Sequence, residues 1–534
     1  MGLYLRPDPY LTRPASGGGS ANGTSADKFS VAGTGFRWST LRRATHATNS
    51  YFVGKSFFGT PDYDTTTRRF LFACFATGTN NVEDLAALAI TILSMSFKDP
   101  DTGTWTKFVF NGGAGIVADP AGALKGVWTP DIEWPVAANK MVEYRVNYSV
   151  AAGAVANGIA VAIKNTSHPT LIDGTAGATS NTTMDALMTN NGTVNGGGHT
   201  DVYLPVAMVC KGGDGRPAIW CVGDSIGMGT SMTAATSLWT DRRTFGGLEM
   251  GLDDNVGAKR LAYHNTCIAG NSPSEWRTRS WWQYKLDLFK DLHDALGYIS
   301  FHRVFMAHGH NAGGPNSLGL VLDNKGVCDL IHSEVGSDMP ITAVEVIPSP
   351  LSTNGYQSAG AQSPSPVFDY PTGAAWQWSA AVEPGGTYRL DGTVDDNLPW
   401  WEGLCFDTGS QRDLFPVLTG ATTLTVALSP GALSSAQVAD TTAFAVGDGV
   451  IISTTGSNVT AGTFSAGTIT AITPGVAPAG TLTLAQTANV PAGGWSIGTG
   501  VFRAVSGDGT HPFTVGHHML KAPIAAWKVA RGLA

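Results

Sequence analysis

Short apolar runs alternate with longer stretches of helical spacing through the second half of the chain. The apolar runs predict buried strands at 218–223, about 261–268, 303–307 and 340–347. The helical spacing predicts helices over about 274–296, 317–333 and about 514–530. Because strands and helices alternate, we expect a parallel sheet covered by helices on both faces.

A different pattern precedes this region. From residue 28 to residue 211, short β-type runs such as 69–75 and 141–148 are separated by glycine-rich and Asp-Pro turns. This pattern predicts an antiparallel β-sandwich or jelly roll. Its residues Trp105, Trp128 and Trp134 are either core residues or stacking positions for carbohydrate. Residues 1–27 are dominated by Pro, Gly and Ser, which predicts an extended N-terminal arm.

The segment 417–500 interrupts the strand and helix alternation. Its only charged residues are Asp440 and Asp448, and Thr, Ala, Gly and Ser predominate. Strand-like openings recur at 423–427 and 481–485, and residues 449–452 are strongly apolar. These features predict a small β-barrel or sandwich inserted into the α/β domain, which would be divided into parts 212–416 and 501–534.

Composition narrows the classes of partner and the compartment. The 534 residues carry a net charge of −8 without a Lys/Arg cluster, which argues against nucleic acid as the main partner. No apolar run is long enough to span a membrane. The first 20 residues lack the apolar region of a signal peptide, so we expect a cytoplasmic, extracellular or virion-associated protein. The six cysteines are scattered without a Cys-x-x-Cys motif, and we expect buried thiols.

Candidate chemistry lies in four short blocks, at the ends of predicted strands and before the last helix. They are Gly223-Asp224-Ser225, residues 265–271, Gly309-His310-Asn311 and residues 508–512 (Asp-Gly-Thr-His-Pro). A serine hydroxyl at the end of a parallel strand lies where α/β sheets place their reactive groups. It is a weak nucleophile by itself and needs a base and oxyanion donors from elsewhere in the chain.

Together the four blocks resemble the SGNH, or GDSL-type, serine hydrolase family, over about 212–415 and 501–534. The resemblance implies a three-layer, flavodoxin-like α/β domain and a reaction without cofactor or metal. It makes Ser225 the nucleophile, His511 the general base and Asp508 the residue that orients His511. The oxyanion donors would be the backbone N–H groups of Ser225 and Gly270 and the side-chain amide of Asn311. Ala312 follows Asn311 at a position where the family often has Asp.

Two other interpretations of these residues remain. Residues 223–227 also fit Gly-x-Ser-x-Gly, the nucleophile elbow of α/β-hydrolases, although that fold places several strand and helix units before the elbow. His308 and His310 have the spacing of a metal-ligand pair, with His264 and His302 nearby in sequence, but no carboxylate motif accompanies them.

The leading functional hypothesis is a serine esterase that removes short acyl groups, in particular acetyl, from an acylated glycan. A second hypothesis is a phage tail or receptor-binding protein with an accessory hydrolase domain, because the insertion resembles those of phage tail proteins. Its assembly would be a virion or a homo-oligomer. A lipase or thioesterase is a third hypothesis, and the lack of an evident amphipathic lid argues against it.

Overall fold

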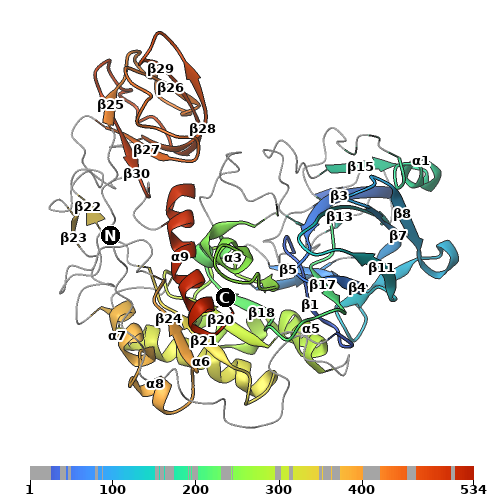
Figure 1. The fold of residues 1–534 in the computed structure, drawn as a ribbon. Coiled ribbons are helices and arrows are strands. Elements are labelled where there is room, and N and C mark those ends of the chain that lie inside the picture. Colours follow the sequence, from blue (N-terminus) through green and yellow to red (C-terminus); the bar gives the residue numbers. More distant parts are fainter. Residues whose placement is uncertain are drawn as a thin grey trace.

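The computed structural model describes residues 26–36, 44–45, 50–77, 82–86, 88–150, 155–156, 161–162, 174–190, 192, 194, 202–229, 242, 244–294, 302–311, 317–347, 351–352, 362–363, 373–400, 421–453, 465–506 and 511–533. Most of the predicted N-terminal arm, Ala312, Cys405 and Asp508 therefore lie outside the described residues. Figure 1 shows three parts: an N-terminal β module, a central α/β domain and a small β domain near its last helix.

The N-terminal module consists mainly of two antiparallel sheets with an apolar core between them. One sheet contains β1 (Ser30–Val31), β17 (Ala207–Cys210), β4 (Thr65–Ala73), β10 (Gly126–Trp128) and β11 (Ile132–Val136). The other contains β15 (Gly174–Ala178), β3 (Tyr51–Gly59), β12 (Met141–Ser149), β7 (Ile90–Lys98), β8 (Trp105–Val109) and β9 (Ile116–Ala118). The runs predicted at 69–75 and 141–148 thus fall largely within β4 and β12.

The second half of β4, in the first of these sheets, is buried on both faces, which the sequence pattern did not predict. In β4, Phe70 and Phe72 point into the core of the module. Leu71 and Ala73 lie on the opposite face, in one apolar cluster with Trp220 of the α/β domain. The N-terminal module and the α/β domain therefore share a hydrophobic core.

Three tryptophans, Trp105, Trp128 and Trp134, could be core residues or stacking positions for carbohydrate. In the structure they lie in the core or at its edges. Trp134 is buried and stacks on Phe97, with ring centroids 4.9 Å apart. Trp128 is half-buried and packs against the shared core. Trp105 is half-buried beneath the guanidinium of Arg145, which lies 4.4 Å from its ring centroid. Each ring has a packing partner inside the protein.

The central domain is built on five parallel strands in the order β19 (Tyr263–Asn265), β18 (Ile219–Gly223), β20 (Arg303–Ala307), β21 (Ile341–Val344) and β24 (Asp396–Leu398). In chain order this is 2-1-3-4-5, the order of flavodoxin-like sheets. Among the described residues, β18 comes first in the chain and is the only strand of this sheet before Ser225, unlike the arrangement that leads to an α/β-hydrolase elbow.

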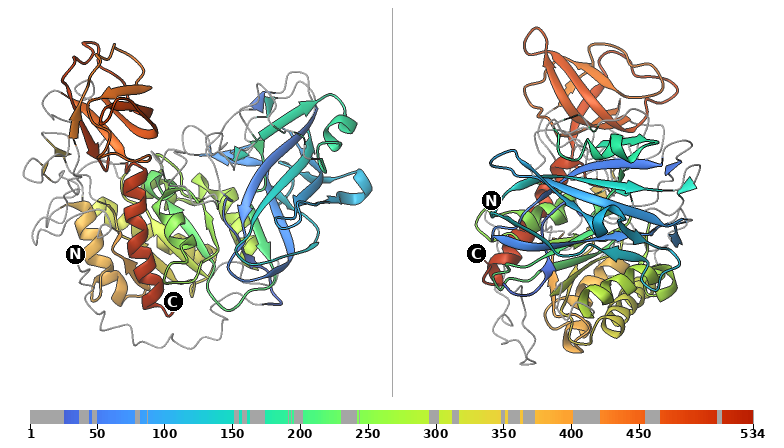
Figure 2. Two further views of the ribbon diagram at one scale, coloured as in Figure 1. Left: turned by 45° about the horizontal axis from the view of Figure 1, so that its top comes forward. Right: turned by 90° about the vertical axis from the view of Figure 1, so that its right-hand side faces the viewer.

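Helices cover both faces of this parallel sheet. Trp220 and Val222 of β18 face the cluster that contains α5 (Gln283–Asp294), α6 (Ser317–Glu334) and α7 (Ala374–Val382). Ile219 and Cys221 face the opposite cluster, with α3 (Gly246–Asp253) and α9 (Thr514–Ala530). Figures 1 and 2 show α9 running along the domain toward the C-terminus. This alternation of side chains is expected for a strand buried on both faces.

The helix predicted over 274–296 is wrong as a single element. The structure has α4 (Pro273–Trp276), a 3-10 turn (Arg279–Trp281) and then α5. The carboxylate of Glu83, in β6 (Glu83–Leu85) of the N-terminal module, accepts the N–H groups of Tyr284 (2.7 Å) and Lys285 (3.2 Å). A carboxylate at these donors satisfies a new helix start and interacts favourably with its dipole, so α5 begins there.

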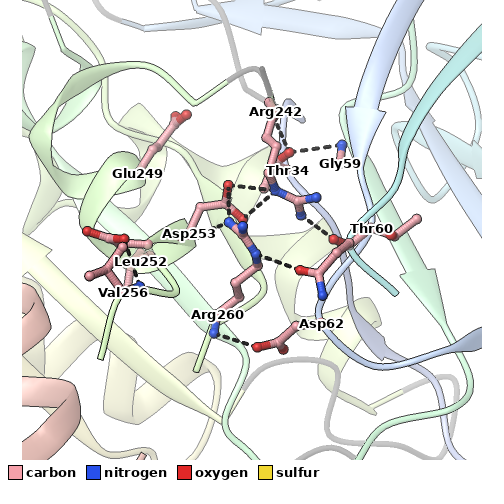
Figure 3. A network of polar contacts seen from close by, with 12 residues as sticks. Thr34, Gly59, Thr60, Asp62, Arg242, Glu249, Leu252, Asp253, Val256 and Arg260 are labelled. Carbon is pink, nitrogen blue, oxygen red and sulfur yellow. Dashed lines mark hydrogen bonds and ion pairs between the residues drawn. The ribbon is translucent and has the colours of Figure 1, made fainter. Parts of the chain in front are cut away.

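A buried cluster of ion pairs in the α/β domain also contacts the N-terminal module (Figure 3). Asp253, at the end of α3, lies 2.9 Å from Arg242 Nε and 3.1 Å from Arg260 Nη1. Arg242 also donates to the carbonyl of Thr60, and the backbone N–H of Arg260 donates to Asp62 (3.0 Å). Because Thr60 and Asp62 belong to the N-terminal module, these contacts fix it against α3.

The inserted segment forms a six-stranded antiparallel sheet in the order β25 (Ala421–Thr423), β30 (Gly500–Ala504), β27 (Gly449–Ser453), β28 (Ser465–Pro474), β29 (Gly480–Ala488) and β26 (Ser435–Val438). A bridge between Leu424 and Val438 joins its two ends, so the sheet closes around its own core. We call this unit the inserted barrel. Strand β30 belongs to it, although the sequence boundary at residue 500 assigned these residues to the α/β domain.

Two expectations from composition can be compared with the structure. Cys74, Cys210, Cys221, Cys267 and Cys328 are buried free thiols, as expected. Within the described part of the chain, no helix is both long and apolar enough to cross a membrane.

Candidate active site

The turn that carries Ser225 follows directly from β18. The strand ends at Gly223, where an added Cβ would lie 2.4 Å from the carbonyl oxygen of Ala307 in β20. Only glycine lets the two backbones approach so closely. Asp224 then caps the single-turn helix α2 (Ser225–Met228), and Ser225 is its first residue. The hydroxyl thus lies at the carboxyl edge of the parallel sheet, as the sequence predicts.

His511, from the C-terminal part of the chain, contacts this serine. Its Nε2 atom lies 2.9 Å from Ser225 Oγ, although 286 positions separate the two residues. His511 is half-buried, and Ser225 has only 3% of its surface exposed. A hydrogen bond of this length is the geometry required for transfer of the serine proton to an imidazole. Asp508, the predicted partner of His511, lies outside the described residues.

The second and third blocks lie beside the serine turn. The N–H of Ile268 donates to the carbonyl of Gly223 (3.0 Å), which holds the second block against the end of β18. Gly270 follows in the left-handed region at φ 84°, which glycine adopts without strain. The side-chain amide of Asn311 donates to the carbonyl of Asn271 (3.0 Å). A hydrogen bond therefore links the loops that carry Gly270 and Asn311, the two predicted oxyanion donors outside the serine turn.

Asp224 holds the serine turn to the third block, a role that the sequence did not reveal. Its Oδ1 accepts the N–H of Ile226 (3.0 Å). Its Oδ2 accepts the N–H groups of Gly309 (3.1 Å) and His310 (3.0 Å), just before Asn311. One buried carboxylate thus fixes the position of Asn311 relative to Ser225. Its place between a predicted strand and the candidate nucleophile was the only signal available in the sequence.

Replacing Asp224 with asparagine should separate this function from simple stability. An amide can accept at only one atom, so its NH₂ group would face backbone donors. We expect kcat for ester hydrolysis to fall about tenfold to a hundredfold with KM little changed, and stability to fall by about 1–3 kcal/mol. Steady-state kinetics and urea unfolding measure the two effects.

Asp119→Asn is the matched control for this substitution. Asp119 also accepts a backbone N–H, that of Ala121 (2.8 Å), but in an exposed turn of the N-terminal module. It should keep the kinetics of the natural chain. An Asp224→Asn protein with unchanged kcat would show that the ties to Gly309 and His310 do not matter for the reaction.

A further set of polar contacts holds α2 in place. The amide of Asn265 donates to the carbonyl of Gly227 (3.0 Å) and to Glu249 Oε1 (2.8 Å). Glu249, in α3, also accepts the hydroxyl of Tyr263 (3.0 Å). Asn265 belonged to the second sequence block without an assigned role, and its partners could not be predicted because they come from distant elements.

The other histidines near the site are poor candidates for the base. His308 is buried, its ring meets Trp276 edge to face, and burial lowers its pKa to about 4. Burial likewise lowers the pKa of His264 to about 3. Both rings stay neutral at physiological pH. Among the described residues, no group of three or more His, Cys, Asp and Glu could hold a metal ion, so the structure does not extend the His308 and His310 pair into a metal site.

Comparisons with known proteins give distant structural likenesses. No family model matches the chain, and no curated protein matches it. Among the solved structures is one described as a possible lipase from Chitinophaga pinensis, with 10% identity, a TM-score of 0.26 and coverage of 60% of this chain and 100% of that chain. A carbohydrate acetylesterase from Xanthomonas citri has 10% identity and a TM-score of 0.21, with 80% of this chain and 89% of that chain covered. A family two carbohydrate esterase from Clostridium thermocellum has 10% identity and a TM-score of 0.19, with 59% and 77% covered.

Proposed function

We propose that this protein is a serine ester hydrolase that forms an acyl-enzyme on Ser225. The observation that carries the proposal is the 2.9 Å hydrogen bond between His511 Nε2 and Ser225 Oγ at the carboxyl edge of the parallel sheet. The loops of Gly270 and Asn311, placed beside the same turn, support it. Together these residues supply a nucleophile, a base and candidate donors for an oxyanion.

In the first half of the reaction, Ser225 Oγ attacks the acyl carbon while His511 Nε2 takes the serine proton. The carbonyl oxygen becomes negative and would be stabilised by the N–H groups of Ser225 and Gly270 and by the amide of Asn311. When the intermediate collapses, the ester C–O bond breaks and His511 gives its proton to the departing alcohol. Water, deprotonated by His511, then attacks the acyl carbon; the bond to Ser225 Oγ breaks, His511 returns its proton to Oγ, and the carboxylic acid leaves. Asp508 would orient the ring of His511.

The substrates that we propose are short acyl esters, in particular O-acetyl groups on a polysaccharide. The chain carries no basic cluster for an anionic polymer, and the inserted barrel, which adjoins His511, is almost free of charge. Neutral, hydroxyl-rich surfaces are compatible with a neutral glycan. The esterases of Xanthomonas citri and Clostridium thermocellum are named for carbohydrate esters, and the same class is the natural first set to test.

The test is acetate release from a panel of acetylated polysaccharides, together with hydrolysis of p-nitrophenyl acetate and p-nitrophenyl octanoate. We expect acetate release from at least one polymer and a higher kcat/KM for the acetyl than for the octanoyl ester. Preference for octanoate would instead favour a lipase or thioesterase. Hydrolysis that persists unchanged in a Ser225→Ala protein would overturn the acyl-enzyme on Ser225, and a natural chain that hydrolyses none of these esters would overturn the ester hydrolase itself.

A further inference from the structure

The inserted barrel is covalently and structurally continuous with the loop that carries His511. Strand β30 pairs with β25 and β27 of the barrel, and the chain then passes through Ser506 and His511 into α9. The N–H of Phe513 donates to the carbonyl of Val505 (2.7 Å), and the hydroxyl of Ser506 donates to the carbonyl of His511 (2.9 Å). These bonds close the base of the loop. The position of His511 is thus set by β30 on one side and by α9 on the other.

Apolar contacts also pack the barrel against the residues that follow His511. Phe513 is buried two residues after His511, and a Cβ added to Gly449 of β27 would lie 1.8 Å from Phe513 Cδ2. Ile451 of the barrel belongs to one apolar cluster with Phe513 and with Ile226, the residue after Ser225. Figures 1 and 2 both place the barrel beside the N-terminal end of α9. The barrel therefore packs on the elements that hold the base and the nucleophile.

Asp448, one of the two charged residues of segment 417–500, pairs with a residue of β30. Asp448 is buried, with Oδ2 2.9 Å from Arg503 Nε and Oδ1 3.0 Å from Arg503 Nη2. Arg503 lies in β30, eight residues before His511. Asp440, the other charge, bonds to the N–H and hydroxyl of Thr442 in its own exposed turn. The charge-assisted hydrogen bond from Arg503 Nη2 to the buried carboxylate of Asp448 holds β30 beside the start of β27.

We infer that the inserted barrel is a positioning element for the general base, and that Asp448 and Gly449 are its positioning residues. The inference rests on the proposed function for its effect on catalysis, but the placement of the His511 loop can be measured without it. Within the barrel, the Asp448–Arg503 pair ties β30 to β27, and β27 packs against Phe513. His511, between these two anchors, is thereby kept within hydrogen-bond reach of Ser225. Binding or docking by the barrel is not required for this role.

Two substitutions with matched controls test the inference. Asp448→Asn removes the charge that orients Arg503, and Asp440→Asn makes the same change in the exposed turn. Gly449→Ala adds a methyl group against Phe513 and against the carbonyl of Ala504. Gly493→Ala adds the same group in the same domain, where nothing lies within 4 Å.

We expect Asp448→Asn and Gly449→Ala to lower kcat about tenfold to a hundredfold with KM nearly unchanged, because a displacement of about 1 Å at a catalytic group can cost about a hundredfold. Hydrogen exchange of the Phe513 amide, which donates to Val505, should become faster in both. The two control proteins should match the natural chain in kcat and in exchange. Kinetics should be measured well below the melting temperature of each variant, so that unfolding does not contribute.

Unchanged kcat in Asp448→Asn and Gly449→Ala, at a temperature where both are folded, would overturn the inference. So would equal losses in the variants and their controls. If the natural chain hydrolyses no ester, the proposed function fails separately, and the exchange of the Phe513 amide then decides alone whether the barrel holds the residues beside His511.

Discussion

Replacing Ser225 with alanine is expected to lower kcat for p-nitrophenyl acetate by about 10⁵- to 10⁶-fold, the scale seen when a serine nucleophile is removed. The methyl group cannot form the acyl-enzyme, and His511 loses the proton that it would accept at 2.9 Å. Because the change removes a single hydroxyl and leaves the backbone of α2 as it is, the fold and its melting temperature should be almost unchanged.

A serine-directed fluorophosphonate gives an independent measurement of the same prediction. It should add its mass to the peptide that contains Ser225 in the natural chain, and the label should be absent from Ser225→Ala. Ser333→Ala is the matched control, since Ser333 lies in α6 and its hydroxyl donates only to the helix carbonyl of Leu330 (2.9 Å) among its described partners. Full hydrolysis by Ser225→Ala, or labelling at another serine, would exclude Ser225 as the nucleophile.

The elements closest to this serine could be predicted because their burial pattern is simple. The strand expected at 218–223 is β18, that at 303–307 is β20, and the last helix spans 514–530 as expected. Each is buried along a continuous run or a regular stripe, so its period is visible locally. Strand β24 was missed, because its sequence Asp-Asn-Leu is short and polar.

Features set by distant partners could not be predicted. The break before α5 depends on Glu83, two hundred residues earlier, whose carboxylate satisfies the first donors of the helix. Burial raises the pKa of Glu83, and the ammonium group of Lys285 opposes that rise. Nothing near residue 283 in the sequence reveals this carboxylate. The same holds for Asp224, whose bonds to Gly309 and His310 exist only once β18 and β20 are adjacent.

The candidate site could be predicted from the positions of strand ends together with the family resemblance. Strand ends predicted where Ser225 and Asn311 would meet, because parallel strands bring their carboxyl ends to one edge. The pairing of Ser225 with His511 came only from the family resemblance, since no local pattern connects residues 286 positions apart. Asp508 stays a prediction.

The N-terminal module and the inserted barrel both pack on the α/β domain. The pattern of the N-terminal region alone was compatible with a separate attachment module. Its sheet instead supplies Leu71 and Ala73 to the core of the α/β domain, and its Glu83 begins α5. The inserted barrel is likewise packed onto α9, and its strand β30 leads toward His511. Both parts therefore belong to the structural support of the site, whatever surfaces they also present to substrate.

Replacing His511 with alanine is the second change for which we expect a very large effect, a loss of about 10⁴- to 10⁶-fold in kcat. Without Nε2 no group accepts the serine proton during attack or returns it to the alcohol. The pH dependence should change as well. In the natural chain kcat/KM should fall toward acid pH, because a protonated imidazole cannot accept a proton. In His511→Ala that acidic limb should disappear, and the residual rate should rise with hydroxide concentration.

His308 and His264 cannot replace His511 in producing this limb, since burial keeps their pKa values at about 4 and about 3. His332→Ala is the matched control, because the ring of His332 lies at the end of α6, 3.1 Å from the carbonyl of Met339. It should retain both kcat and the pH profile. Added imidazole should restore part of the activity of His511→Ala by entering the space of the missing ring. If the acidic limb persists in His511→Ala, another group is the base, and the contact between His511 and Ser225 is structural.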